Sequence, residues 1–209
     1  MKIYDWHIAP NLRRMHIYLA EKGPQCPARR SRRRGPKTEA GPHRQVPHAL
    51  VPMLELDDGT CIGEAMAICR YFEEIYPEPP LMGVEARDKA IVEMWEKRAN
   101  EERMLAASEL FRNTAPTFAG RGLPGSADPI PQLPQLVERA KARLGRFYGK
   151  FDQQLAANEF VAGPRYTIAD ITTLCAIDFG KWTDLDIPAE CKKLRRWYDA
   201  VSARPSAKV

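Results

Sequence analysis

The chain has 209 residues, of which 44% are hydrophobic and 28% charged, and its formal net charge is +5. This length allows one compact unit or two small domains with a sizeable core. No run approaches the roughly 18 apolar residues that a membrane-spanning helix needs, and the N-terminus lacks the apolar block of a signal peptide. We therefore expect a cytoplasmic protein with no membrane partner.

The positive charge is concentrated in one segment. Residues 24–49 hold six arginines, one lysine and one glutamate, a net charge of +6, so the rest of the chain carries −1. A nucleic-acid-binding function would depend on this arginine cluster alone, and its affinity would fall steeply as the salt concentration rises. We expect no nucleic-acid partner.

The cysteines argue against a disulfide framework and against a zinc site. The chain has five, an odd number, widely spaced and without a Cys-x-x-Cys pair. Disulfide scaffolds and zinc sites need paired or closely spaced cysteines. We expect reduced thiols and no metal.

The first residues predict a strand, a loop and a helix. Residues 2–6 are typical of a short strand, Pro10 and Asn11 mark a loop, and residues 12–22 follow a helical pattern that Gly23 ends. A thiolate is stabilised beside a helix N-terminus and hydrogen-bond donors. This loop is therefore a candidate place for sulfur chemistry.

Residues 24–49 interrupt the pattern, with five prolines and Val46 as the one large aliphatic or aromatic residue. A buried parallel strand needs a near-continuous apolar run, so we expect none here. Three interpretations stay open: a disordered basic insertion, an arm that binds RNA or an anionic membrane, or a stretch translated out of frame. We favour the last because the change is abrupt at both ends. It fails if neither other reading frame of the encoding nucleotides gives an amphipathic strand and helix.

The stretch after this segment predicts a tight hairpin. Pro52 opens a short apolar run, Asp57-Asp58-Gly59 forms a turn, and Cys61-Ile62 resumes the strand pattern. X-Pro bonds are the ones that adopt the cis form with any frequency. A cis Val51–Pro52 bond would turn the Val51 backbone outward, where it could pair with an extended peptide.

After Gly63 the apolar period becomes helical until Pro77 ends it. The first turn of this helix offers unpaired backbone N–H groups and the positive end of the helix dipole. Glu64, Ala65 and Met66 therefore form a seat for a carboxylate. Taken alone, a hairpin followed by a helix is also a common structural unit with no ligand.

The second half of the chain predicts helices. Residues 84–113 and 135–157 carry apolar stripes, and residues 114–134 are rich in Pro and Gly and predict a loop. Thr167 and Asp170 have the spacing of a capping-box variant, in which Asp170 accepts from the Thr167 N–H. A last helix is expected before Arg204.

Together these pieces closely resemble the glutathione S-transferases. The arrangement is Val-Pro, a strand, an Asp-Gly turn, a strand, then Glu at the start of a helix that ends in Tyr-Pro. Ala-Pro-Asn-Leu-Arg-Arg at 9–14, Tyr-Thr-Ile-Ala-Asp-Ile-Thr at 166–172 and Trp-Tyr-Asp-Ala-Val-Ser-Ala-Arg-Pro at 197–205 agree with it. The resemblance spans nearly all of the chain apart from residues 24–49. It implies a thioredoxin-like α/β domain over residues 1–80 and an all-α domain over residues 84–209.

The resemblance also implies roles for single residues. Val51 and Pro52 would bind the cysteinyl backbone of glutathione, and Glu64 and Ala65 its γ-glutamyl end. The family usually has Ser after this Glu, so Ala65 removes one hydrogen bond, worth about 1 kcal/mol. Asn11 would hold the sulfur, although a loop-capping role is equally open to it.

Four further positions concern the reaction itself. Ala9 stands where cysteine-type members carry their nucleophile, so we expect no covalent thiol chemistry from the protein. Met104, Phe111 and Phe118 are candidates for a second-substrate pocket, with core packing as the alternative for each.

The function implied is a detoxifying enzyme, a homodimer without prosthetic group, that joins the glutathione thiolate to a hydrophobic electrophile. The alternative is a weak or silent transferase-like protein that acts by binding or interaction. Ala9, Ala65 and the segment 24–49 support this alternative.

Overall fold

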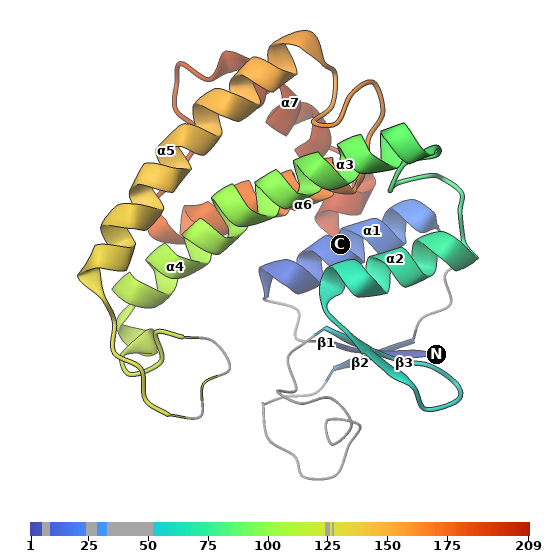
Figure 1. Ribbon diagram of the computed structural model, residues 1–209, viewed down its shortest axis with the longest axis horizontal. Helices are drawn as coiled ribbons and strands as arrows, with labels where there is room; N and C mark the ends of the chain where they lie inside the picture. Colours follow the sequence, from blue (N-terminus) through green and yellow to red (C-terminus); the bar gives the residue numbers. More distant parts are fainter. Residues whose placement is uncertain (6–8, 24–28, 33–51, 124–125, 127) are drawn as a thin grey trace. The chain divides into compact units, whose positions relative to one another are not determined.

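The computed structural model describes residues 1–5, 9–23, 29–32, 52–123, 126 and 128–209 (Figure 1). The chain divides into two units by its internal contacts: Met1–Leu81 with Lys208–Val209, and Met82–Ala207. Unit 1 contains a four-stranded sheet, and unit 2 is mainly helical. Within the described ranges, no helix is both long enough and apolar enough to cross a membrane.

The sheet of unit 1 has the strand order β2-β1-β3-β4. Its strands are β1 (Lys2–Asp5), β2 (Arg29–Arg32), β3 (Met53–Glu55) and β4 (Cys61–Gly63). β1 runs parallel to β2 and antiparallel to β3, which is antiparallel to β4. The paired residues Ile3 and Leu54 are both 0% exposed, so the centre of the sheet is part of the core.

Strand β2 adds to the expectation for residues 24–49. Arg29–Arg32 pairs in parallel with β1 at the edge of the sheet, so the segment contains a parallel strand, whereas composition excluded only a buried one. An edge strand needs only backbone N–H and C=O groups on one side, and any residue except proline supplies both. Residues 24–28 and 33–49 of this segment, and with them the choice among its three interpretations, lie outside the described residues.

Two helices lie side by side in unit 1, and their first turns are at the same end in Figure 1. They are α1 (Pro10–Lys22), which has proline in its first turn, and α2 (Ala65–Ile75). The helix expected after Gly63 is confirmed, and its buried face includes Ala65, Ile68 and Phe72, each at most 2% exposed. Ile75, at the end of the helix, is 41% exposed.

A buried lysine joins the ends of the two helices. The Lys22 side chain is 0% exposed, and its Nζ lies 2.5 Å from Glu73 Oε2. It also donates to the carbonyl oxygens of Pro77, at 3.3 Å, and Pro79, at 2.7 Å. The Tyr18 hydroxyl donates to the same Glu73 oxygen at 2.5 Å. These contacts fix the end of α1 to the end of α2 and to the chain that follows.

Unit 2 begins with a helix that continues through a π-helical turn. Its parts are α3 (Ala86–Ala99), the π segment η2 (Asn100–Met104) and α4 (Leu105–Thr114), followed by the 3-10 turn η3 (Pro116–Phe118). The later elements are α5 (Pro134–Ala157), α6 (Ile168–Gly180), η4 (Lys181–Thr183), α7 (Lys192–Ser202) and η5 (Pro205–Lys208).

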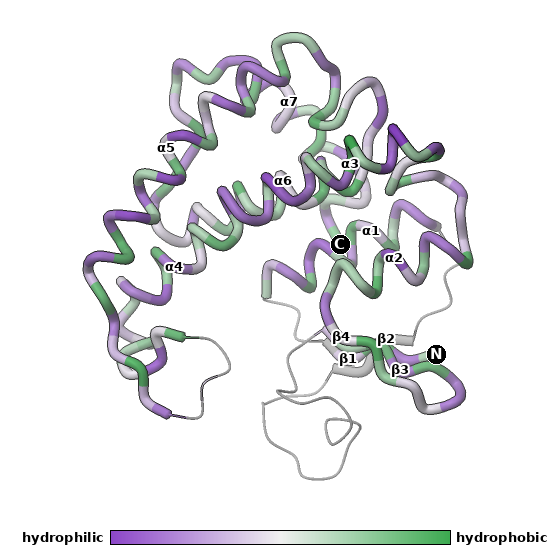
Figure 2. Tube along the Cα trace, viewed as in Figure 1, coloured by the Kyte–Doolittle hydropathy of each residue, from purple (hydrophilic) through white to green (hydrophobic). Residues whose placement is uncertain are grey.

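Helix α5 is amphipathic and α6 is central. Figure 2 shows hydrophobic and hydrophilic residues interspersed along α5, whose buried residues include Leu144, Phe147 and Phe151. In α6 every residue except Asp178 is buried, and the helix packs against α3. A helix that is apolar all round belongs in the core.

Asp170 connects three parts of unit 2 and is 0% exposed. The predicted capping box is confirmed, because the Thr167 N–H donates to Asp170 Oδ2 at 2.9 Å. The other oxygen, Oδ1, accepts from the Val161 N–H and from the Trp197 Nε1–H, both at 2.8 Å. The carboxyl group therefore joins the loop before α6, the first turn of α6 and helix α7.

The burial of Asp170 predicts a pH dependence of stability. Burial raises the pKa of Asp170 from 3.8 to about 6, although the hydrogen bonds from Val161, Trp197 and Thr167 oppose the rise. A carboxyl group whose pKa is raised in the folded protein stabilises the fold fully at pH values below its unfolded pKa. This stabilisation is lost as the pH rises through the folded pKa. For Asp170 the stabilisation amounts to about 3 kcal/mol. We expect the unfolding free energy of the wild type, minus that of Asp170→Asn, to fall between about pH 4 and pH 6.

Urea denaturation of both proteins across this pH range measures the difference. Taking the difference between the two unfolding free energies removes the contribution of all other carboxyl groups, because both proteins contain them. A difference that rises with pH would show that the hydrogen bonds outweigh burial.

Candidate functional site

The predicted hairpin of β3 and β4 is confirmed. Its turn is closed by two backbone bonds, Leu56 N–H to Thr60 O at 2.8 Å and Gly59 N–H to Leu56 O at 3.1 Å. Gly59 has φ +86°, a region that favours glycine. The Thr60 N–H donates to Asp58 Oδ1 at 2.8 Å, and this bond is the main cause that lowers the pKa of Asp58. Pro52 is buried immediately before β3.

The start of α2 has two features of an anion-binding turn. Among the described residues no side chain makes a capping hydrogen bond to it, and its first turn contains no acidic residue, so the backbone N–H groups at the positive end of the helix dipole have no side-chain acceptor there. Glu64, the residue before the helix, has φ +66° and an exposed side chain. Such a backbone costs about 1–3 kcal/mol and is held by its surroundings. Here Gly63 pairs with Met53, and the Ile68 N–H donates to Glu64 O at 3.0 Å.

The start of α1 presents one side-chain amide. Asn11 is exposed, and its Oδ1 accepts from Arg14 Nη2 at 3.1 Å. This bond orients the amide so that its NH2 group is left as a donor. The neighbouring Leu12 N–H is a second possible donor to a ligand at this turn, but it already donates to Ala9 O at 3.0 Å. Asn11 is thus the stronger candidate of the two.

The structure places the described candidates of the glutathione site in unit 1. Asn11 lies in the first turn of α1, and Glu64 and Ala65 lie at the start of α2. Because both first turns are at the same end of the helix pair, these residues share one end of the unit (Figure 1). Val51, and with it the form of the Val51–Pro52 bond, lies outside the described residues.

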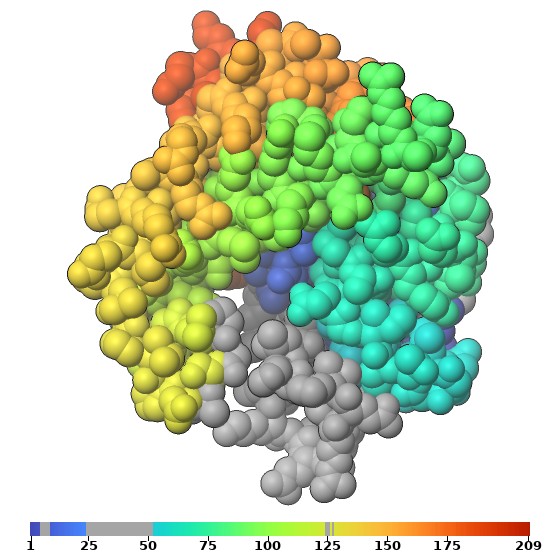
Figure 3. All heavy atoms as spheres, viewed as in Figure 1, coloured from blue at the N-terminus to red at the C-terminus, as the bar shows by residue number. Residues whose placement is uncertain are grey.

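The candidates for a second-substrate pocket lie in unit 2. The rings of Phe111 and Phe118 contact each other edge to face, with centroids 5.2 Å apart. Both are partly exposed, and Figure 3 shows the connection after α4, in yellow-green, on the visible surface of the unit. Met104 is 4% exposed in the π segment, so its side chain is part of the packed interior.

Two aromatic residues that the sequence did not single out join this pair. Phe179, at the end of α6, and Trp182, in η4, have ring centroids 5.8 Å and 5.5 Å from that of Phe111. In the sequence, the three-residue spacing of Phe179 and Trp182 at the end of a helix indicates that the two rings lie on the same side of the chain. The contact with α4 is long-range, and spacing along the chain does not show it.

The described cysteines are poor candidates for a nucleophile. Burial raises the pKa of the Cys61 and Cys191 thiols, and the Cys61 Sγ–H donates to Gly59 O at 3.6 Å. Among the residues that the structure describes, no group of His, Cys, Asp or Glu is placed to hold a metal ion.

Comparisons with known proteins agree with this geometry. The family described as "Glutathione S-transferase, N-terminal domain" matches residues 3–80, and "Glutathione S-transferase, C-terminal domain" matches residues 103–205. "Glutathione S-transferase 2" of Saccharomyces cerevisiae is 35% identical over 220 residues, covering 100% of this chain and 88% of the relative. The solved structure of a glutathione S-transferase domain-containing protein from Marinobacter aquaeolei is 33% identical. It covers 99% of both chains with a TM-score of 0.85.

A relative with a different name also matches. "Elongation factor 1-gamma" of Prunus avium is 33% identical over 134 residues, which are 64% of this chain and 29% of that protein. The same architecture is therefore also part of longer proteins that carry another name.

Proposed function

Because the chain belongs to the glutathione S-transferase family, we propose that it binds glutathione in unit 1 and joins its sulfur to a hydrophobic electrophile. The thiolate attacks an electrophilic carbon, a C–S bond forms, and the leaving group departs or the product takes up a proton. The thiol proton passes to solvent when the thiolate forms. No group other than the two substrates is needed for this balance.

The observation that carries the proposal is the uncapped start of α2. The γ-glutamyl carboxylate accepts from the backbone N–H groups of Ala65 and Met66, where the helix dipole favours an anion. The exposed carboxylate of Glu64 meets the ammonium of the same γ-glutamyl group. The carboxylate and the ammonium of the γ-glutamyl group thus each meet a group of opposite charge.

The remaining contacts are proposed from the hairpin and from α1. Val51 and Pro52 hold the cysteinyl backbone, and Pro52 is buried where it enters β3. The Asn11 amide donates to the sulfur, since Arg14 already occupies its oxygen. A donor to the sulfur favours the thiolate and lowers the pKa of the bound thiol.

The experiment that tests this function is calorimetric titration with glutathione and with its deaminated analogue, glutaryl-Cys-Gly. We expect one-site binding of glutathione and at least about tenfold weaker binding of the analogue, which lacks the ammonium that meets Glu64. Equal affinities would overturn the placement at Glu64, and no binding by the folded protein would overturn the function.

Serine at position 65 is expected to strengthen glutathione binding. Ala65→Ser adds a hydroxyl at the buried start of α2, where it can donate to the γ-glutamyl carboxylate. One added bond to a charged acceptor is worth about 1–2 kcal/mol, so the Kd should fall roughly 5- to 30-fold. Calorimetry with glutathione measures it.

The matched control is Ala67→Ser, which makes the same change two residues further along α2, on its exposed face. It should leave the Kd unchanged within a factor of two. If both variants strengthen binding equally, or neither does, the carboxylate is not seated at Ala65.

A second candidate function is that of a transferase-like binding or interaction protein with little turnover. Ala65 in the position of the usual serine favours it, and so does the similarity to elongation factor 1-gamma. Loss of free thiol from glutathione in the presence of an electrophile panel separates the two. Binding without thiol loss for any electrophile would select this second function.

The proposal includes a cytoplasmic homodimer that detoxifies electrophiles. Light scattering of the purified chain gives the mass of the particle in solution. A mass of twice 23.7 kDa is the expected result.

A further inference from the structure

A buried arginine lies in the interior of unit 2. Arg103 belongs to the π segment η2 and is 0% exposed. Its Nη2 donates to the Tyr148 hydroxyl at 2.9 Å and, at the long distance of 3.5 Å, to the backbone oxygen of Leu185. Gly180 leaves the space for this group, because a Cβ atom at position 180 would lie 2.7 Å from the guanidinium carbon. Arg103 thereby connects α5 to residues 181–187, which we call the 181–187 segment.

The guanidinium group of Arg103 is incompletely paired. Its Nε and Nη1 atoms, which carry most of its N–H donors, make no hydrogen bond in the part of the chain that the structure describes. Burial lowers the pKa of Arg103, and within the same ranges no carboxylate pairs with it to oppose this effect. The rings of Phe147 and Tyr148, with centroids 6.0 Å and 5.2 Å from the guanidinium carbon, offer it only a weaker attraction.

This pairing deficit disfavours the arrangement in which Arg103 is covered. A buried N–H group without an acceptor has lost its hydrogen bonds to water and gained none in return, and the loss is larger for a charged group. The 181–187 segment is the neighbour of Arg103 that water reaches most readily. Its exposed residues are Lys181, Trp182, Asp184 and Asp186.

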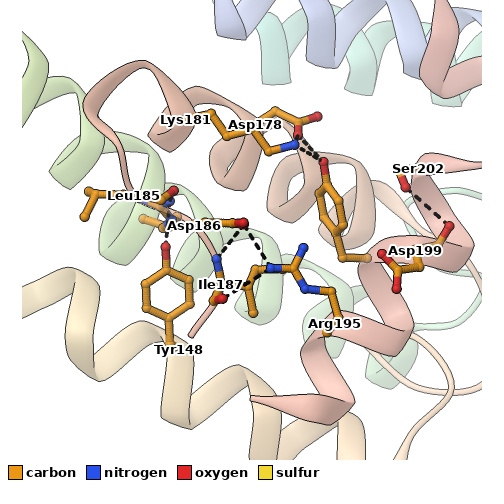
Figure 4. Close-up of polar contacts among 11 residues, drawn as sticks. Tyr148, Asp178, Lys181, Leu185, Asp186, Ile187, Arg195, Asp199 and Ser202 are labelled. Atoms are coloured by element: carbon orange, nitrogen blue, oxygen red, sulfur yellow. Dashed lines mark hydrogen bonds and ion pairs between the residues drawn. The ribbon is translucent and has the colours of Figure 1, made fainter. Parts of the chain in front are cut away.

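Helix α7 holds the 181–187 segment in place from the outer side (Figure 4). Lys181 Nζ donates to the Tyr198 hydroxyl at 2.5 Å. Arg195 Nη2 donates to Asp186 Oδ1 at 3.0 Å and to the backbone oxygen of Ile187 at 3.2 Å. The side chains of Arg195 and Asp186 are 39% and 63% exposed, so water competes for this ion pair and the pair is weak.

We propose that the 181–187 segment opens by local unfolding while the rest of unit 2 stays folded, and that Arg103 lowers the free energy of this opening. In the open form water completes the hydrogen bonds of the guanidinium group. In the closed form the segment keeps its bonds to α7. Segments with few buried contacts open at a lower free energy than the whole fold, and here an incompletely paired cation lowers it further.

This inference goes beyond the proposed function, since it concerns the fold of unit 2 and needs neither glutathione nor turnover. The segment carries Trp182, so each opening also displaces that ring. Native-state hydrogen exchange of the full chain measures the opening. The Leu185 N–H donates to Gly180 O at 3.1 Å and exchanges when the segment opens.

Replacing Arg103 by methionine keeps a side chain of similar length and removes every N–H donor. We expect Arg103→Met to slow exchange at Leu185 by about tenfold, because opening then no longer hydrates a buried cation. Unchanged or faster exchange would overturn the proposal. Amides in the buried middle of α6 report global unfolding in the same sample. A slowing there without one at Leu185 would also overturn it, because Arg103 would then destabilise the whole unit and not this segment.

The matched control is Arg195→Met, the same substitution at the arginine on the outer side of the segment. It removes the bonds to Asp186 and Ile187 that hold the segment closed, so exchange at Leu185 should become about threefold faster. The two arginine variants are thus expected to act in opposite directions. If both slow the exchange, the loss of a positive charge is the cause and the role of Arg103 is refuted.

Tyr148→Phe tests the inference with Arg103 in place. It removes the hydroxyl that accepts from Arg103 Nη2 and keeps the ring, so one more donor lacks a partner in the closed form. We expect exchange at Leu185 to become about fivefold faster in the wild-type background and to stay unchanged in the Arg103→Met background. An equal effect in both backgrounds would contradict the proposal.

Discussion

Replacing Lys22 by methionine is expected to lower the free energy of unfolding by about 3–5 kcal/mol, the usual cost of breaking a buried ion pair by removing one partner. The substitution removes the ion pair between Lys22 and the Glu73 carboxylate, which is 9% exposed. It also removes the donor to the Pro77 and Pro79 carbonyl groups. Methionine fills nearly the same volume, so the loss is electrostatic and not a cavity. Urea denaturation at neutral pH measures it.

The matched control is Lys97→Met, because Lys97 pairs with Glu101 at 3.0 Å on the surface of α3 and η2. The two side chains are 66% and 47% exposed, and such pairs contribute about 0–1 kcal/mol. A loss for Lys22→Met no larger than that for Lys97→Met would refute the role of Lys22. Lys22→Met with Glu73→Gln should recover part of the stability, since no buried charge then remains unpaired.

Asp170→Ala is expected to lower the free energy of unfolding by about 3 kcal/mol at neutral pH. Three buried donors lose their acceptor, the N–H groups of Val161 and Thr167 and the indole of Trp197. Each unsatisfied donor costs about 1–3 kcal/mol. Removing a buried carboxyl group, whose pKa burial raises, offsets part of this cost. Denaturant titration followed by Trp fluorescence reports the change.

Asp152→Ala is the matched control, with the same substitution at a more accessible helix start. Asp152 Oδ1 accepts from the N–H groups of Lys193 and Leu194 at 2.8 Å and 2.9 Å, at the start of α7. Water can replace this acceptor, so the expected cost is that of an ordinary cap, about 1 kcal/mol. Equal losses for the two variants would mean that Asp170 acts as a cap alone and does not join α6 to α7.

Local sequence signals predicted most of unit 1 and the helices of unit 2. The Asp-Gly turn, the change of period after Gly63 and the Thr167–Asp170 spacing each depend on residues within a few positions of one another. All three are present in the structure. Strand β2 was missed because an edge strand pairs through its backbone, which hydropathy does not report.

The candidate site was predictable only in part. The resemblance to the family pointed to Asn11, Glu64 and Ala65, but it could not show that Glu64 has a positive φ or that Arg14 donates to the Asn11 oxygen. The contacts of Phe111 with Phe179 and Trp182 join residues some 70 positions apart in the chain. Such contacts follow from how helices pack, and a periodic pattern shows only which face of a helix is buried.

The position of β2 bears on how this family can vary. In the sheet of the described residues β2 pairs with β1, and two strands separate it from β4, which leads directly into Glu64 and α2. The register of the hairpin is set by Met53 with Gly63 and by Leu54 with Ile62, without any contribution from β2. A change of sequence in this outer strand therefore leaves intact the pairing that positions Glu64 and the start of α2.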